Sequence, residues 1–124
     1  MGFGLDTMQG EVTTTDATQT MSLSYDFPTN SVPDNSTAIV QMRVIGFDSS
    51  QNSIAIEQTY VVKRQSGNCS IVGSATTIMN NHDLALVLAS AVLNIDGSAI
   101  EVDVTGVIDT TINWGARIDI LYYS

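Results

Sequence analysis

Residues 112–124 read INWGARIDILYYS, and apolar side chains fill the even-numbered positions from Ile112 to Tyr122. A spacing of two is typical of a β-strand with one buried face, because successive side chains of a strand point to opposite faces of the sheet. Trp114 is the only tryptophan of the chain and belongs to this apolar set. Its large ring can anchor a small core. The sequence therefore predicts a half-buried strand that ties the C-terminal residues into a sheet.

The same alternation recurs along the chain. Tyr25 and Tyr60 lie in alternating segments, and we expect both to anchor the core together with Trp114. Turn-forming residues separate the segments. Strands are expected at 21–27, 37–47, 53–65, 70–79, 84–95, 100–105 and 112–124. Residues 84–95 also fit a helical face, but the neighbouring strands and the Asp96-Gly97 turn favour a strand.

The first residues show no such period. Residues 1–12 contain glycines and scattered apolar side chains, and we expect an arm that orders against a neighbouring subunit. Phe3, Leu5 and Met8 are its candidate docking side chains. Residues 13–124 are expected to form one all-β domain, an antiparallel β-sandwich or jelly-roll-like fold with about seven or eight strands.

Composition excludes several classes of function. The chain has 124 residues, of which 44% are apolar and 14% charged, with four basic and thirteen acidic residues and a net charge of −9. Nucleic-acid binding requires many phosphate-neutralising cations, and anionic membrane surfaces attract clustered Lys and Arg. We therefore expect neither nucleic acid nor a membrane as partner.

Candidate catalytic groups are few. His82 is the only histidine and Cys69 the only cysteine, which leaves too few ligands for a structural zinc site and no evident nucleophile–base pair. Glu101 and Asp103 share one face of an expected strand and could serve acid–base chemistry. An exposed strand face explains this pair more simply. We therefore expect no catalytic, cofactor-binding or metal-binding residues, and a protein that is not an enzyme.

Several short motifs are shared with a group of phage proteins. The segment TTTDAT at 13–18 and the segment INWGARI at 112–118 together resemble a group of β-rich bacteriophage virion proteins. Residues 38–46, 60–64, 71–74 and 96–106 are similar to that group as well, so the resemblance covers about residues 10 to 122. The group often has a histidine after the tryptophan, where this chain has Gly115, and its central strands are richer in arginine.

The resemblance implies a structural component of the virion surface, assembled in the host cytoplasm. We expect a symmetric homotrimer that decorates the capsid as a cement protein and bridges subunits of the major capsid protein or other virion subunits. The alternative is a tail-fibre module, or a receptor- or carbohydrate-binding module that contacts a glycan through the loops at 28–36 and 106–111. A chain of this length that begins at its own Met1 favours the capsid.

Overall fold

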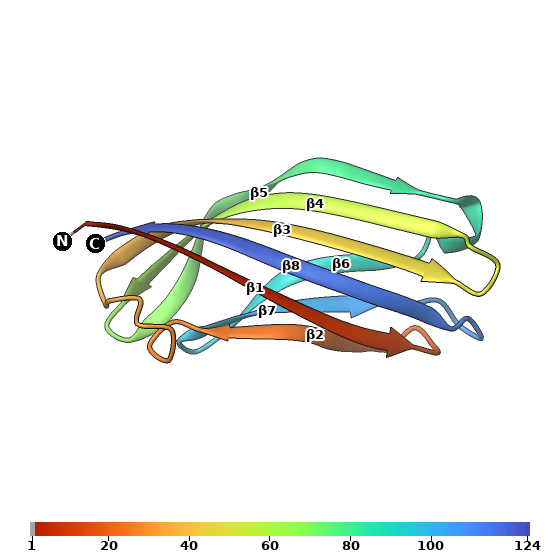
Figure 1. The fold of residues 1–124 in the computed structure, drawn as a ribbon, viewed down its shortest axis with the longest axis horizontal. Helices are drawn as coiled ribbons and strands as arrows, with labels where there is room; N and C mark the ends of the chain where they lie inside the picture. Colours follow the sequence, from red (N-terminus) through yellow and green to blue (C-terminus); the bar gives the residue numbers. More distant parts are fainter. Residues whose placement is uncertain (1) are drawn as a thin grey trace.

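Eight strands and one short 3-10 turn make up the computed structural model, which describes residues 2–124 (Figure 1). All six strand pairings are antiparallel. The antiparallel β-sandwich expected from the sequence is therefore confirmed. The elements are β1 (Phe3–Thr14), β2 (Gln19–Asp26), β3 (Ser36–Asp48), β4 (Ser53–Gln65), β5 (Asn68–His82), η1 (Leu84–Leu86), β6 (Ser90–Asp96), β7 (Ala99–Thr105) and β8 (Ile112–Tyr123). No helix within residues 2–124 has the length and apolarity required to cross a bilayer.

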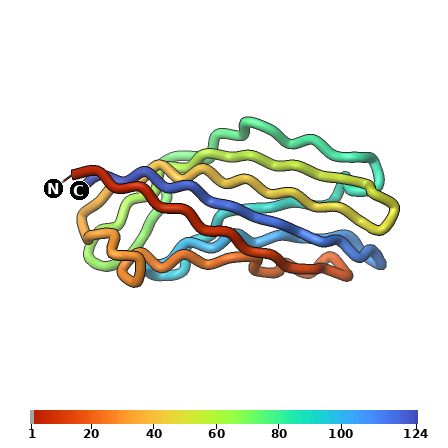
Figure 2. The backbone as a smooth tube through the Cα atoms, in the orientation of Figure 1, coloured from red at the N-terminus to blue at the C-terminus, as the bar shows by residue number. Residues whose placement is uncertain are grey.

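The strands form two layers. The larger sheet has the order β1-β8-β3-β4-β5, and the smaller sheet has the order β2-β7-β6 (Figure 1). The two ends of the chain lie side by side at one end of the elongated molecule (Figure 2). Gly2 and Ser124 exchange both backbone hydrogen bonds, at 3.1 and 3.2 Å. The closing strand β8 therefore lies inside the sheet, between β1 and β3.

The core fills the space between the two layers. Trp114, Tyr60 and Tyr25 are 3%, 4% and 0% exposed and pack with aliphatic side chains from both inner faces. The Trp114 indole Nε1–H donates to Thr14 Oγ1 at 2.9 Å, and the Tyr60 hydroxyl accepts a hydrogen bond from the Leu93 backbone N–H at 3.2 Å. Each polar atom of these buried rings thus has a partner, as burial requires.

The N-terminal segment differs from its prediction. Residues 3–14 form the edge strand β1, paired with β8 along its whole length, and not an arm that waits for a neighbour. The period is hidden because glycines fill two inward positions where a neighbouring group leaves no room for a side chain. A Cβ on Gly4 would lie 2.0 Å from the Tyr122 ring, and a Cβ on Gly10 would lie 2.2 Å from the Ser22 carbonyl oxygen. The sandwich therefore includes the segment assigned to the arm.

Residues 84–95 also differ in part. The strand expected there begins only at Ser90, and Leu84–Leu86 form the turn η1. Leu86 is fully buried while Leu84 and Leu88 are exposed, so the apolar run is divided between core and surface. Only Leu84–Leu86 turn, and the remainder of the helical spacing, Ala91 and Ile95, lies in strand β6.

Candidate interaction surface on the five-stranded sheet

The outward side of the five-stranded sheet, here called the outer face, is not covered by any element within residues 2–124. Its side chains are the odd-numbered residues of β1, β8, β3 and β4, together with alternate residues of β5, because a strand points its side chains to opposite sides in turn. In an ordinary half-buried sheet this side is polar. Here part of it is apolar.

Strand register lines up five aliphatic side chains across the outer face. Leu5 pairs with Leu121, Leu121 with Ile39, Ile39 with Val61, and Val61 with Val72. These residues, here called the apolar row, are between 37% and 81% exposed. Exposed apolar patches that extend beyond isolated side chains are uncommon in soluble monomers and are typical of interaction surfaces.

Two aromatic rings extend the apolar row at the end of the molecule that carries the chain termini. Phe3 and Tyr123 pair in register, and their ring centroids lie 4.7 Å apart. On the other side of the row a shallow depression of about 550 Å³ is lined by Leu5, Ile39 and Leu121 and by polar groups that include Asp119. The outer face therefore offers apolar contact area beside a charged group.

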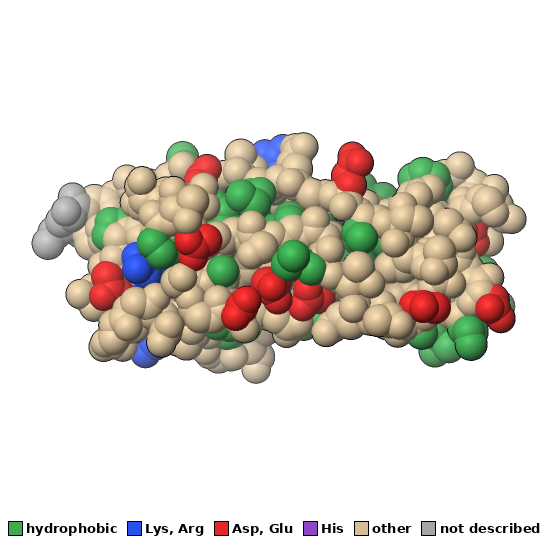
Figure 3. Space-filling view, turned by 90° about the horizontal axis from the view of Figure 1, so that it is seen from below, with side chains coloured by type: hydrophobic (Ala, Val, Ile, Leu, Met, Phe, Trp, Pro, Cys, Tyr) green, Lys and Arg blue, Asp and Glu red, His purple; other side chains and the backbone are tan. Residues whose placement is uncertain are grey.

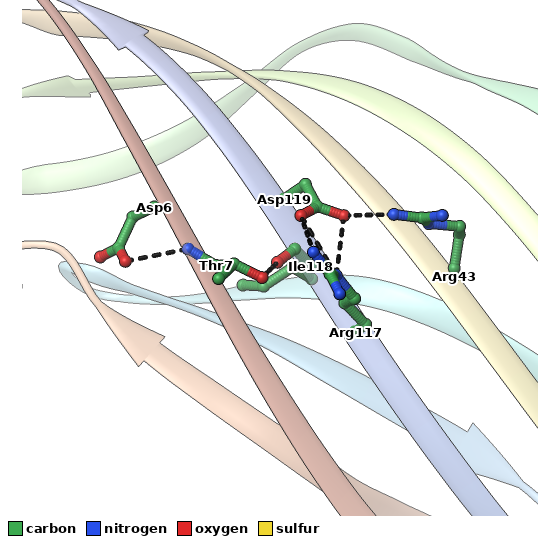
Figure 4. A network of polar contacts seen from close by, with 6 residues as sticks. All are labelled: Asp6, Thr7, Arg43, Arg117, Ile118 and Asp119. Carbon is green, nitrogen blue, oxygen red and sulfur yellow. Dashed lines mark hydrogen bonds and ion pairs between the residues drawn. The ribbon is translucent and has the colours of Figure 1, made fainter.

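That charged group is a cluster of three side chains on β3 and β8 (Figure 4). Asp119 Oδ2 accepts a hydrogen bond from Arg43 Nη2 at 2.5 Å, and Asp119 Oδ1 accepts one from Arg117 Nη2 at 2.9 Å. The hydrogen bonds from the Arg117 guanidinium, helped by those from Arg43, hold the pKa of the Asp119 carboxyl below its usual range. Asp119 thus keeps together two arginines that the register places directly opposite each other.

Charge is distributed unequally over the molecule. Three of the four basic residues, Arg43, Lys63 and Arg117, lie on the outer face, where Glu11, Glu57 and Asp119 balance them. The sum on this face is zero, so the net charge of −9 belongs to the remainder of the chain. Figure 3 shows the molecule from below, where acidic side chains are spread along its length.

The docking residues named from the sequence divide between the two sides of β1. Phe3 and Leu5 are exposed on the outer face, whereas Met8 points inward and packs against the core. The next inward residue before it, Asp6, accepts a hydrogen bond from the Tyr25 hydroxyl at 2.6 Å. Burial, followed by this hydrogen bond, raises the pKa of Tyr25. Two of the three side chains therefore belong to the surface described above.

The other candidate groups lie apart. Asp103 is buried, not on an exposed strand face as expected, and accepts a hydrogen bond from Asn94 Nδ2 at 2.6 Å. Glu101 is half-buried, and burial, with the charges of Asp103 and Asp96, raises its pKa. Cys69 is buried, and burial raises the pKa of its thiol to about 11. His82 is exposed at the end of β5, and within residues 2–124 no three acidic, His or Cys side chains gather as metal ligands.

The loops expected to contact a glycan, at 28–36 and 106–111, contain no aromatic residue, and Tyr25, Tyr60 and Trp114 are core residues. Among the described residues, the exposed aromatic rings are Phe3, Phe47 and Tyr123, all on the outer face. Any contact through aromatic side chains therefore involves the same face as the apolar row.

Comparison with known proteins gives one structural match. No family model matches this sequence, and no curated protein matches it either. A crystal structure of a tailspike protein from Acinetobacter baumannii bacteriophage Fri1, described as a capsular polysaccharide depolymerase, matches 96% of this chain at a TM-score of 0.49 and 11% identity. The match covers only 17% of that protein.

The tail-fibre alternative stays a prediction, because a match at 11% identity and a TM-score of 0.49 assigns no role to this chain. The expectation that the protein is not an enzyme is contradicted, because the matched tailspike is an enzyme. The depolymerase activity is that of the much longer protein, and no catalytic residue is transferred to this chain. Capsid decoration and the homotrimer stay predictions.

Proposed function

We propose that this protein is a structural module of a bacteriophage tail, held in the particle by contacts of its outer face. The observation that carries the proposal is the apolar row, which crosses all five strands and is exposed to solvent in the isolated chain. The resemblance of residues 13–18 and 112–118 to phage virion proteins supports the choice of particle.

Energetics favour covering this surface. Each aliphatic side chain moved from water into an apolar contact contributes about 25 cal/mol of favourable free energy per Å² of apolar area buried. The charges of the outer face are already paired or balanced, so docking strips little water from uncompensated charge. A surface that combines apolar area with zero net charge is suited to a permanent structural contact.

A single exposed substitution tests the proposal. Leu5→Glu places a carboxylate in the apolar row, and Leu5 is 81% exposed, so the fold should tolerate the change. Leu84→Glu is the matched control, because Leu84 is 85% exposed and lies off the outer face in η1. The labelled proteins would be mixed with separated tails and capsids of the phage that encodes this chain.

The expected result is that wild-type protein and Leu84→Glu sediment with tails while Leu5→Glu does not. Sedimentation of the wild-type protein with capsids alone would refute the tail location and support capsid decoration. Binding of neither fraction by the wild-type protein, or equal binding by both variants, would refute a docking role for this face.

A further inference from the structure

We infer that a second copy of this chain covers the outer face, related to the first by a two-fold axis that runs parallel to β3 and passes over it. This inference rests on the docking role proposed above and names the partner: a copy of this chain on the tail presents the same face to the copy that docks. Two sheets packed face to face keep their strands nearly aligned. A two-fold contact uses the same surface on both subunits, so the surface must complement itself.

The register shows that the outer face does complement itself. Rotation about an axis along β3 keeps each row of side chains opposite the same row of the second copy but reverses the order of the strands. Strand β3 then meets β3, β8 meets β4, and β1 meets β5. In the apolar row, Ile39 faces Ile39, Leu121 faces Val61, and Leu5 faces Val72. Apolar side chains therefore meet apolar side chains across the whole width of the sheet.

Charges on the outer face match under the same operation. Arg117 and Arg43 lie in one row with Glu57, so Arg117 of each copy faces Glu57 of the other. Lys63 lies in the row of Tyr123 and faces that ring, an arrangement that favours a cation–π contact. Arg43 meets its own copy on the axis, and in each subunit Asp119 compensates it.

Electrostatics also select this face for self-association. Two chains that each carry −9 repel each other in most orientations. The outer face is neutral, because it holds three of the four basic residues of the chain. Contact through this face therefore keeps the excess acidic residues of both copies away from the interface.

The area is sufficient for a stable dimer. Strands of about 12 residues at about 3.3 Å per residue, five abreast at about 4.8 Å, give a face of roughly 950 Å². A standard protein interface buries about 800 Å² on each partner. The outer face of one subunit can thus supply a whole interface.

Native mass spectrometry and sedimentation velocity test the inference. The wild-type protein should show twice the chain mass of 13.2 kDa. Ile39→Asp places two carboxylates opposite each other on the axis, and we expect it to weaken dimerisation by at least about tenfold. Ile108→Asp is the matched control, because Ile108 is exposed in the loop between β7 and β8, and it should leave the dimer intact.

A charge exchange tests the geometry itself. Arg117→Glu alone and Glu57→Arg alone should each weaken the dimer, because each places like charges opposite one another. The double variant restores opposite charges across the interface and should recover a large part of the affinity. Recovery would support the two-fold arrangement, and its absence would overturn this alignment of rows.

Three outcomes would overturn the inference. The first is a wild-type monomer up to about 100 μM, since interfaces of this size bind in the micromolar range or tighter. The second is a trimer, which a two-fold contact does not produce. The third is a dimer that survives Ile39→Asp but is lost in Thr7→Lys, which would indicate pairing of β1 edges.

The result is separable from the proposed function. A monomeric wild-type protein that still joins tails through Leu5 would leave the proposed function intact and overturn the dimer. A dimer lost in Ile39→Asp, with no binding to tails or capsids, would support the dimer and refute the role in the particle.

Discussion

Replacing Trp114 by alanine is the most demanding test of the core. The indole is 3% exposed and its N–H donates to Thr14 Oγ1 at 2.9 Å. A buried tryptophan removes about 150–250 Å² from water, which at about 25 cal/mol per Å² corresponds to about 4–6 kcal/mol as an upper bound. Measured Trp→Ala changes in cores cost about 3–5 kcal/mol, and we expect that range here.

Urea unfolding followed by circular dichroism would measure the loss, together with the thermal midpoint. For a chain of this size each kcal/mol lowers Tm by about 3–6 °C, so Trp114→Ala should lower it by about 10–25 °C. Trp114→Phe separates two contributions, because it keeps most of the apolar area but leaves the Thr14 hydroxyl without its donor. It should therefore fall between wild type and alanine.

Tyr123→Ala is the control on the same strand. Tyr123 is 47% exposed on the outer face, so its removal should cost less than about 1 kcal/mol in the monomer. Trp114→Ala should reduce assembly only by reducing the folded fraction. A Trp114→Ala variant with an unchanged urea midpoint but lost assembly would refute the assignment of this ring to the core.

Three further predictions concern single residues. Gly46→Ala should lose about 1–3 kcal/mol in urea unfolding, because its Cβ would lie 2.7 Å from the Trp114 ring, whereas Gly115→Ala meets nothing within 4 Å and should change stability by less than about 1 kcal/mol. Because the pKa of Asp119 is lowered in the folded protein, its carboxylate stabilises the fold above the unfolded pKa near 3.9. This contribution, under about 1 kcal/mol, is lost as the pH falls through the folded pKa. Asp119→Asn should remove that part of the acid dependence of the urea midpoint. Cys69 should resist iodoacetamide at pH 8 in the folded protein and react in urea, as followed by intact mass; rapid labelling of the native protein would contradict its burial.

Local sequence was sufficient for most strands and hairpins. The alternation in residues 53–65 predicts β4 with the bounds that the structure shows, and Tyr60 faces inward as expected. Ser66 and Gly67 both have positive φ, as a tight turn between β4 and β5 requires. These features are decided by side chains a few residues apart, so a short window of sequence contains the necessary information.

The interpretation of residues 3–12 as an arm was wrong because their pattern depends on neighbours that are distant in the sequence. Positions 4 and 10 require glycine because the Tyr122 ring and the Ser22 backbone occupy the space of a side chain. These groups come close to β1 only when the chain is folded. Asp103 was misplaced for a similar reason, since its partner Asn94 lies on the neighbouring strand.

The sequence by itself determined where most strands alternate and turn, and which side of strands such as β4 and β8 their residues occupy, because a period of two is local. Tertiary structure alone decided the register. Register joins Leu5 to Leu121 and Ile39 to Val61 into one apolar row, and it gathers three of four basic residues on one face. Hydrogen bonds between strands that are distant in the sequence fix these alignments. A shift of one residue would turn every side chain of a strand to the other face.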